Sequence, residues 1–116
     1  MSTADVAAKF SEALKAGNFQ EAETFWSEDV VSLEAHDGPM REARGRAAVH
    51  AKGEQWIANH DVHNFEAFGP YVNGDQFALR FRGEIVSKAT GERMQMDEVG
   101  LYTVRDDRIV EERFFY

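Results

Sequence analysis

The sequence lacks cysteine entirely and has fewer basic than acidic residues. Without cysteine the chain can form no disulfide, thiol nucleophile or thiolate metal site, and such a composition suits a cytoplasmic protein. Its 21 acidic residues outnumber its 13 basic residues, which gives a formal net charge of −8. Because nucleic acids and anionic membranes are bound through clusters of lysine and arginine, we expect neither of them as a partner.

Long apolar segments and familiar catalytic motifs are missing as well. No apolar run approaches the length that spans a bilayer, and the start of the chain lacks the basic and apolar regions of a signal peptide. There is no glycine-rich phosphate loop, no Ser-His-Asp pattern and no HExxH motif, so we expect no cofactor and no metal ion. The nine phenylalanines, two tryptophans and three tyrosines instead predict one packed domain over residues 1–116.

The first half of the sequence predicts three helices and one strand. Apolar residues at helical spacing stop before Gly17, which is typical of a helix end. Asn18 and Glu21 are spaced like a capping box that starts a second, short helix. A strand is expected from Val30 to His36, and a short arm from Met40 to Arg44 leads to a third helix between Gly45 and His60. That helix is expected to bury Val49, Gly53, Trp56 and Ile57.

The second half predicts four strands, because apolar and polar residues alternate between turn signals. The turns are expected at Gly69-Pro70, Asn73-Gly74-Asp75, Thr90-Gly91-Glu92 and Arg105-Asp106-Asp107-Arg108. The strands between them run from Val62 to Phe68, from Gln76 to Lys88, from Arg93 to Val104 and from Arg108 to Tyr116. The resulting order, α-α-β-α-β-β-β-β, predicts an α+β fold with a mainly antiparallel sheet.

The order and spacing of four segments resemble a known family. They are ALKAGNF at residues 13–19, FWSEDVV at 25–31, GRAAV at 45–49 and YTVRDDRIV at 102–110. Together they resemble the SnoaL-like domains of the nuclear transport factor 2-like superfamily, also called the ketosteroid-isomerase-like fold. The resemblance implies a cone, in which a curved sheet wraps around the helices and encloses a pocket. It also implies a homodimer that packs through the outer face of the sheet.

The resemblance implies a base but no oxyanion hole. Glu34 matches the general-base carboxylate of ketosteroid isomerases, and burial in an apolar pocket raises the pKa of such a carboxylate. His36 lies two residues further on the same strand face, where it would assist Glu34 as an acid–base partner. The two donors that stabilise the enolate in those isomerases match Gly100 and Phe10, which cannot donate from their side chains. We therefore expect no ketosteroid isomerase activity.

Other residues on the inward strand faces are predicted to bind a ligand. Glu98, Gly100 and Tyr102 share a face of the penultimate strand, and the same register turns Glu112 and Tyr116 inward, together with Val110 and Phe114. Trp26 and Trp56 are expected to add aromatic walls. The simpler alternatives are a charged strand face around Glu112 and ordinary core packing for the tryptophans. If Glu34, Glu98 and Glu112 lie close together, one of them must hold a proton or a cation must sit among them.

Two functional hypotheses remain open from the sequence. The first is a cofactor-independent acid–base enzyme, such as an isomerase, cyclase or hydrolase, that acts on a small hydrophobic oxygenated compound. Glu34 and His36 would be its catalytic residues. The second is a non-catalytic domain of the same fold that binds a small ligand or supports an assembly. The sequence does not name the substrate.

Overall fold

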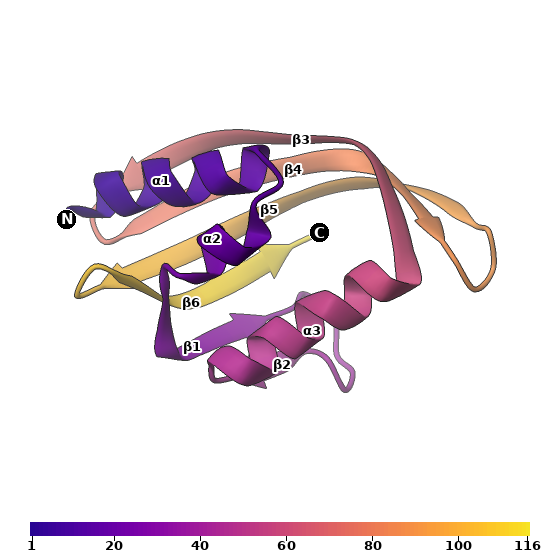
Figure 1. Ribbon diagram of the computed structural model, residues 1–116, viewed down its shortest axis with the longest axis horizontal. Helices are drawn as coiled ribbons and strands as arrows, with labels where there is room; N and C mark the ends of the chain where they lie inside the picture. The colour runs from indigo at the N-terminus through magenta and orange to yellow at the C-terminus, as the bar shows by residue number, and fades with distance from the viewer.

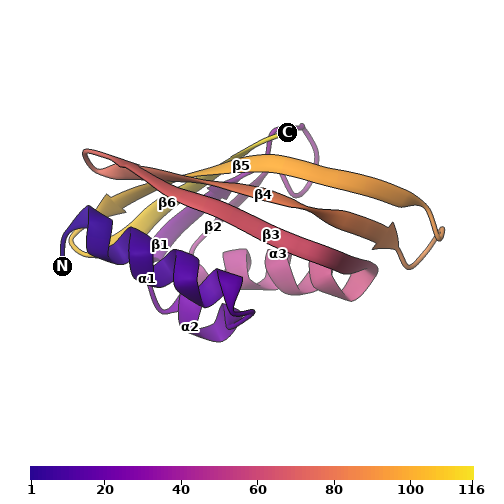
Figure 2. The same cartoon turned by 90° about the horizontal axis from the view of Figure 1, so that it is seen from above.

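A curved sheet of six strands forms one layer of the molecule, and three helices cover one face of it (Figures 1 and 2). The computed structural model describes all residues from 1 to 116. The strands are β1 (Trp26–Leu33), β2 (Glu42–Arg44), β3 (His60–Asn73), β4 (Gln76–Ser87), β5 (Arg93–Arg105) and β6 (Arg108–Phe115). Their order across the sheet is β2-β1-β6-β5-β4-β3, and only β1 and β6 run parallel. The predicted α+β cone with a mainly antiparallel sheet is confirmed.

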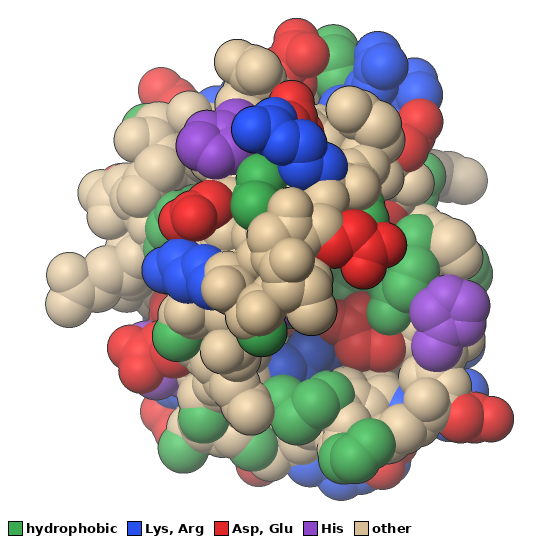
Figure 3. Space-filling model, turned by 90° about the vertical axis from the view of Figure 1, so that its right-hand side faces the viewer, with side chains coloured by type: hydrophobic (Ala, Val, Ile, Leu, Met, Phe, Trp, Pro, Cys, Tyr) green, Lys and Arg blue, Asp and Glu red, His purple; other side chains and the backbone are tan.

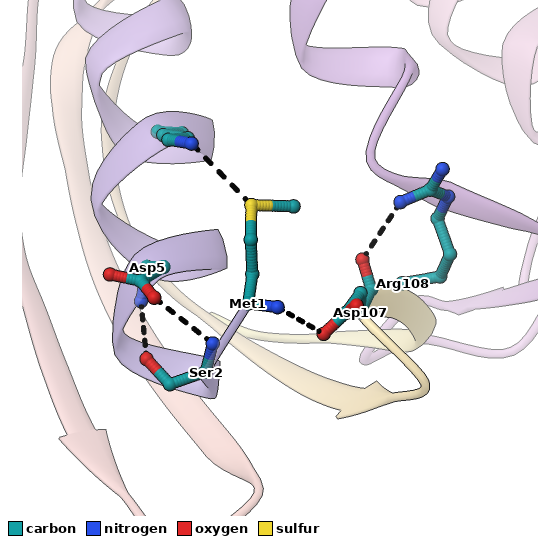
Figure 4. A network of polar contacts seen from close by, with 6 residues as sticks. Met1, Ser2, Asp5, Asp107 and Arg108 are labelled. Atoms are coloured by element: carbon teal, nitrogen blue, oxygen red, sulfur yellow. Dashed lines mark hydrogen bonds and ion pairs between the residues drawn. The ribbon is translucent and has the colours of Figure 1, made fainter.

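The helices are α1 (Thr3–Lys15), α2 (Phe19–Glu23) and α3 (Arg46–Asn59). Ser2 starts α1 with a capping box: its Oγ accepts from the backbone N–H of Asp5 at 3.1 Å, and the Asp5 carboxylate accepts from the N–H of Ser2 at 3.0 Å. Figure 4 shows this cap beside the N-terminal ammonium, which pairs with Asp107 at 3.0 Å. Since Asp107 lies in the turn between β5 and β6, the start of the chain is attached to the end of the sheet. No helix is long and apolar enough to cross a membrane.

Strand β1 lies earlier in the chain than the sequence predicts. It begins at Trp26 instead of Val30, because the N–H of Ile109 donates to the carbonyl of Phe25 at 2.7 Å and starts the pairing with β6 there. It ends at Leu33, so Glu34 and His36 lie in the connection to β2 and not on a strand face. The predicted arm after Pro39 contains β2, which pairs with the end of β1.

Strand β3 is longer than predicted, because Gly69-Pro70 does not end it. The register against β4 shifts between Phe68 and Tyr71, and pairing then continues to Asn73. A proline is tolerated here since β3 is an edge strand, where no neighbour needs its missing N–H. Another register shift, between β5 and β6, turns Ile109 into the core in place of Val110, which the sequence placed on the inward face.

The core forms where the inward side chains of the sheet meet α1. Tyr102 of β5 stacks on Phe77 of β4 with ring centroids 4.8 Å apart, and it meets Phe10 of α1 edge-on at 5.0 Å. These three side chains are almost fully buried. The strand alternation that the sequence predicts for β4 and β5 therefore holds around the core.

Helix α3 does not bury the stripe that its apolar residues predict. Val49 is buried, but Ile57 is 51 % exposed and Gly53 lies at the surface. The inward turn of the helix carries Lys52 instead, whose side chain is only 12 % exposed. The physical reason is that this helix covers a pocket and not a packed core, so charged groups lie beneath it.

Candidate functional site

A pocket of about 640 Å³ is lined by residues of the sheet and of all three helices. Its walls are mainly hydrophobic, with several acidic side chains among them. On the face seen in Figure 3, acidic and basic side chains lie at the bottom of a hollow that hydrophobic side chains border. The pocket is lined by Phe10, Leu14, Phe19, Gln20, Ala22, Glu23, Trp26, His50, Gly53, Glu54, Ile57, Phe65, Phe81, Met96, Glu98, Tyr102, Glu112 and Phe114.

Glu112 of β6 is the most buried carboxyl group of the site, at 7 % exposure. Ser32 of β1 donates a hydrogen bond from its Oγ to Oε2 of Glu112 at 2.8 Å. The same Oγ accepts a hydrogen bond from Nζ of Lys52 at 2.7 Å. Burial raises the pKa of Glu112 to about 7, although Ser32 and Lys52 act in the opposite direction. At neutral pH this carboxyl group is therefore ready both to give and to take a proton.

Lys52 also holds Glu34. Its Nζ lies 3.1 Å from Oε1 of Glu34, and the hydroxyl of Tyr116 donates to Oε2 of the same carboxylate at 3.3 Å. Nζ lies 5.6 Å from the ring centroid of Phe114, close enough for a cation–π contact. The network thus runs from the buried Glu112 through Ser32 and Lys52 to Glu34 and Tyr116, and one cation lies between two carboxyl groups.

Glu98 of β5 lines the pocket without any hydrogen bond or ion pair from the protein. Its burial is partial, and burial raises its pKa to about 7, with a further contribution from the charge of Glu34. Lys52 lowers the pKa but makes no direct contact with Glu98. An unpaired carboxyl group in an aromatic pocket is available to a ligand.

Tyr102 takes the space that Gly100 leaves open. A Cβ atom added at Gly100 would lie 2.9 Å from the hydroxyl of Tyr102 and 3.0 Å from its ring, so the phenol lies over the glycine. The space next to Gly100 is therefore filled by the Tyr102 side chain, which leaves no room there for a ligand. Burial raises the pKa of Tyr102 well above its usual range, and the charges of Glu112, Glu98 and Glu34 add to this effect. Tyr102 stays a neutral phenol, and its hydroxyl has no partner in the protein.

A histidine joins two helices at the edge of the pocket. His50 of α3 contacts Glu23 of α2 through Nδ1 at 2.6 Å and Glu54 through Nε2 at 3.0 Å. The hydrogen bond with Glu23 raises the pKa of His50, and the charge of Glu23 adds to the effect. The carboxylates at this edge are thus partnered by the imidazole.

The structure brings together four of the nine residues that the sequence assigned to the site. Trp26, Glu98, Tyr102 and Glu112 line the pocket. Glu34, His36, Trp56, Gly100 and Tyr116 do not contribute to its walls.

The five residues outside the walls lie in other surroundings. His36 meets the ring of Tyr116 edge-on at 5.0 Å, and Trp56 stacks on His60 at 4.6 Å. Glu34 and Tyr116 join the site only through Lys52, and Gly100 joins it by admitting the ring of Tyr102.

Sequence reasoning missed Lys52 and Ser32. It did predict that a cation or a shared proton must lie among Glu34, Glu98 and Glu112, but it did not name the cation. A signal existed for Lys52, because it follows Val49 by three residues and lies on the same face of α3. A signal for Ser32 also existed, since it alternates with the buried Val30 on β1.

Comparison with known proteins identifies the family. The profile of the SnoaL-like domain matches residues 1–116. A Mesorhizobium loti structure, named both as a SnoaL-like polyketide cyclase and as a carbohydrate phosphatase, has 50% sequence identity, covers 100% of both chains and gives a TM-score of 0.96. An NTF2-like protein from Burkholderia xenovorans has 18% identity, with 97% of this chain and 87% of that chain covered and a TM-score of 0.80.

A more distant structure has the ketosteroid isomerase-like fold and comes from Catenulispora acidiphila in complex with trimethylamine. It has 15% identity, with 99% of this chain and 87% of that chain covered and a TM-score of 0.72. No curated protein matches the sequence. The full-length profile match and the half-identical relative agree with the cone and its pocket, and the chain belongs to the SnoaL-like domain family.

Proposed function

We propose that the protein is an acid–base enzyme that moves a proton on a small hydrophobic, oxygen-containing compound bound in the pocket. The observation that carries this proposal is Glu112, a buried carboxyl group that lines the pocket, has a pKa of about 7 and is held in place by Ser32. A proton-transfer group works best when its pKa lies near the working pH and its position is fixed. The name of the Mesorhizobium loti relative gives two enzyme activities, polyketide cyclase and carbohydrate phosphatase, and so supports an enzyme over a domain without catalysis.

The neighbours of Glu112 supply the other parts of such a site. Tyr102 pairs with Glu112 across β5 and β6, and its neutral phenol is a hydrogen-bond donor for an oxygen on which negative charge develops. Lys52 and Ser32 orient the carboxyl group and act as positioning residues. One oxygen of Glu112 receives the Ser32 bond, which leaves the other for a substrate proton.

Glu34 and His36 remain the catalytic residues that the sequence predicts, but their surroundings favour a different role. Lys52 and Tyr116 occupy both oxygens of Glu34. His36 lies at the surface beyond the end of β1. We propose that Glu34 holds the side chain of Lys52 in place and that Glu112 transfers the proton.

A neutral aromatic probe tests this proposal without knowledge of the natural substrate. Nitrobenzisoxazole loses its ring C–H proton to a base while its N–O bond breaks, and the resulting cyanophenolate is coloured. We expect the protein to accelerate this reaction, with a rate that rises as pH increases through about 7, because the deprotonated form of Glu112 is the base. Glu112→Gln is expected to reduce the protein-dependent rate by about 100-fold.

The matched control is Glu111→Gln, which removes the neighbouring carboxylate on the outer face of β6 and should leave the rate unchanged. A wild-type rate no faster than that of buffer would refute proton transfer in this pocket. If nuclear magnetic resonance then shows that the probe is bound, the second hypothesis, a ligand-binding domain without catalysis, is the better one.

We also propose a homodimer that packs through the outer face of the sheet. Val99 and Phe115 form a cross-strand pair on this face and are 37% and 50% exposed, and Tyr71 at 65% exposure extends the patch to β3. Exposed apolar side chains that share one sheet face are typical of an interface. Sedimentation equilibrium checks the proposal, and a monomer at micromolar concentration would contradict it.

A further inference from the structure

We infer that the ligand of this pocket carries a protonated amine, which pairs with Glu98, on a hydrophobic body that fills the aromatic walls. The inference rests on the proposed function in that it concerns the same pocket. It assigns binding to Glu98 and leaves proton transfer to Glu112. The ligand class is therefore a hydrophobic amine with an oxygen function, and carboxylates and phosphates are disfavoured.

The charges around the pocket carry the first part of this inference. Four carboxyl groups line it, and the one lining side chain able to carry positive charge is His50. Lys52 lies beneath the wall, but Glu34 and Ser32 already occupy its ammonium group. An anionic ligand would meet uncompensated negative charge in a partly buried site, whereas a cation would be attracted.

Glu98 is the one carboxyl group of the lining that no protein group partners. Ser32 donates to Glu112, and His50 contacts both Glu23 and Glu54. Glu98 has no such contact, although the aromatic side chains of the pocket partly shield it from water. A carboxylate in this position is stabilised when a cation arrives, so the ammonium group of a ligand has a defined place to bind.

The remaining walls fit the rest of such a ligand. The rings of Trp26, Phe65, Phe81, Tyr102 and Phe114 surround the cavity, and aromatic faces attract organic cations as well as apolar bodies. The hydroxyl of Tyr102, which lines the pocket, has no partner in the protein and calls for an oxygen acceptor on the ligand.

Binding of an amine is expected to depend on pH through Glu98. The charged groups that act on it are Glu34, beyond β1, which raises its pKa, and Lys52, on α3, which lowers it. Glu98 in turn raises the pKa of Tyr102 on the same strand. The pKa of Glu98 is about 7 in the free protein. Its carboxyl group must therefore lose a proton before it pairs with the ammonium group. Affinity should therefore increase as pH rises from 6 to 8, while an alkylamine stays protonated throughout.

Three probes of one size test the inference by isothermal titration calorimetry at pH 8. They are naphthylethylamine, naphthylethanol and naphthylacetate, which share the ring and differ in the charge of the side group. We expect the amine to bind about 10-fold more tightly than the alcohol, and the carboxylate to bind more weakly than both. Glu98→Gln should abolish the preference for the amine and leave the affinity for the alcohol unchanged. Glu66→Gln, which removes an exposed carboxylate of β3, is the charge-matched control.

The result that overturns the inference is equal binding of amine and alcohol, or an amine preference that survives in Glu98→Gln. The test also separates this inference from the proposed function. Glu112→Gln should still prefer the amine while it loses the nitrobenzisoxazole reaction. A protein that catalyses that reaction but shows no amine preference contradicts only the ligand class. A protein that prefers the amine but does not catalyse the reaction contradicts only proton transfer by Glu112.

Discussion

Replacing Glu112 with glutamine is expected to stabilise the protein at pH 8 by roughly 3 kcal/mol in the free energy of unfolding. Burial raises the pKa of Glu112 from 4.5 to about 7, so the ionised carboxylate opposes folding above that pH. Glutamine removes the charge and keeps an oxygen that can accept from Ser32. The largest stability gain would thus come from the residue to which we assign proton transfer, and it would cost the protein its function.

The contribution of Glu112 to the free energy of unfolding depends on pH, and its sign follows from the raised pKa in the folded protein. Between pH 4.5 and 7 the folded protein binds more protons at Glu112 than the unfolded chain does, so the stability contributed by this group falls as pH rises. That contribution is fully present below about 4.5 and is lost as pH passes through 7. In Glu112→Gln the fall between pH 5 and 8 should be correspondingly smaller.

Urea denaturation at pH 5, 6, 7 and 8 measures this prediction directly. Glu111→Gln is again the control, because Glu111 lies on the outer face of the same strand and should leave the pH dependence as it is in the wild type. The prediction fails if Glu112→Gln is no more stable than the wild type at pH 8.

Replacing Lys52 with methionine is expected to destabilise the protein at pH 8 by roughly 2 to 3 kcal/mol. The substitution keeps a long apolar side chain over Phe114 but removes the ammonium group that contacts both Glu34 and Ser32. Glu34 and Glu112 then share a partly buried site without a cation. At pH 5 the cost should be smaller, because Glu112 and Glu98 hold their protons there.

A double-mutant cycle with Glu34→Gln tests whether Lys52 acts through this pair. Once Glu34 is neutral, Lys52→Met should cost clearly less than it does in the wild type. Lys88→Met is the matched control, since Lys88 lies 3.8 Å from Asp61 in an exposed pair, with side chains 49% and 55% exposed, and should change stability by less than about 1 kcal/mol. Additive effects of the Lys52 and Glu34 substitutions would show that the ion pair does not support the site.

The fold could be predicted from the sequence where local signals decide the structure. Apolar and polar residues alternate along β4 and β5, and the Asp106-Asp107 turn joins β5 to β6, so these strands appear where the sequence predicts them. The start of β1 could not be predicted, because it depends on a bond between Phe25 and Ile109 at the other end of the chain. Gly69-Pro70 failed as a strand end for a similar reason, since the edge position of β3 is a property of the whole sheet.

The residues of the candidate site also divide into those that local patterns predict and those that depend on the whole fold. Strand alternation placed Glu98, Tyr102 and Glu112 on inward faces, and these residues line the pocket. Glu34 and His36 were extrapolated beyond the true end of β1, and a local pattern does not reveal where pairing stops. Lys52 was overlooked because apolar residues on a helix normally mark the buried side, whereas α3 covers a cavity that needs a cation.

The position of Tyr102 over Gly100 has a consequence for how such a site can evolve. The resemblance of the sequence to ketosteroid isomerases matches Gly100 to their aspartic acid donor. In this protein a side chain at that position would collide with the Tyr102 ring, which is itself fixed between Phe10 and Phe77. The two donors are therefore mutually exclusive occupants of one volume. An acidic donor at position 100 would need a smaller side chain at position 102 as well.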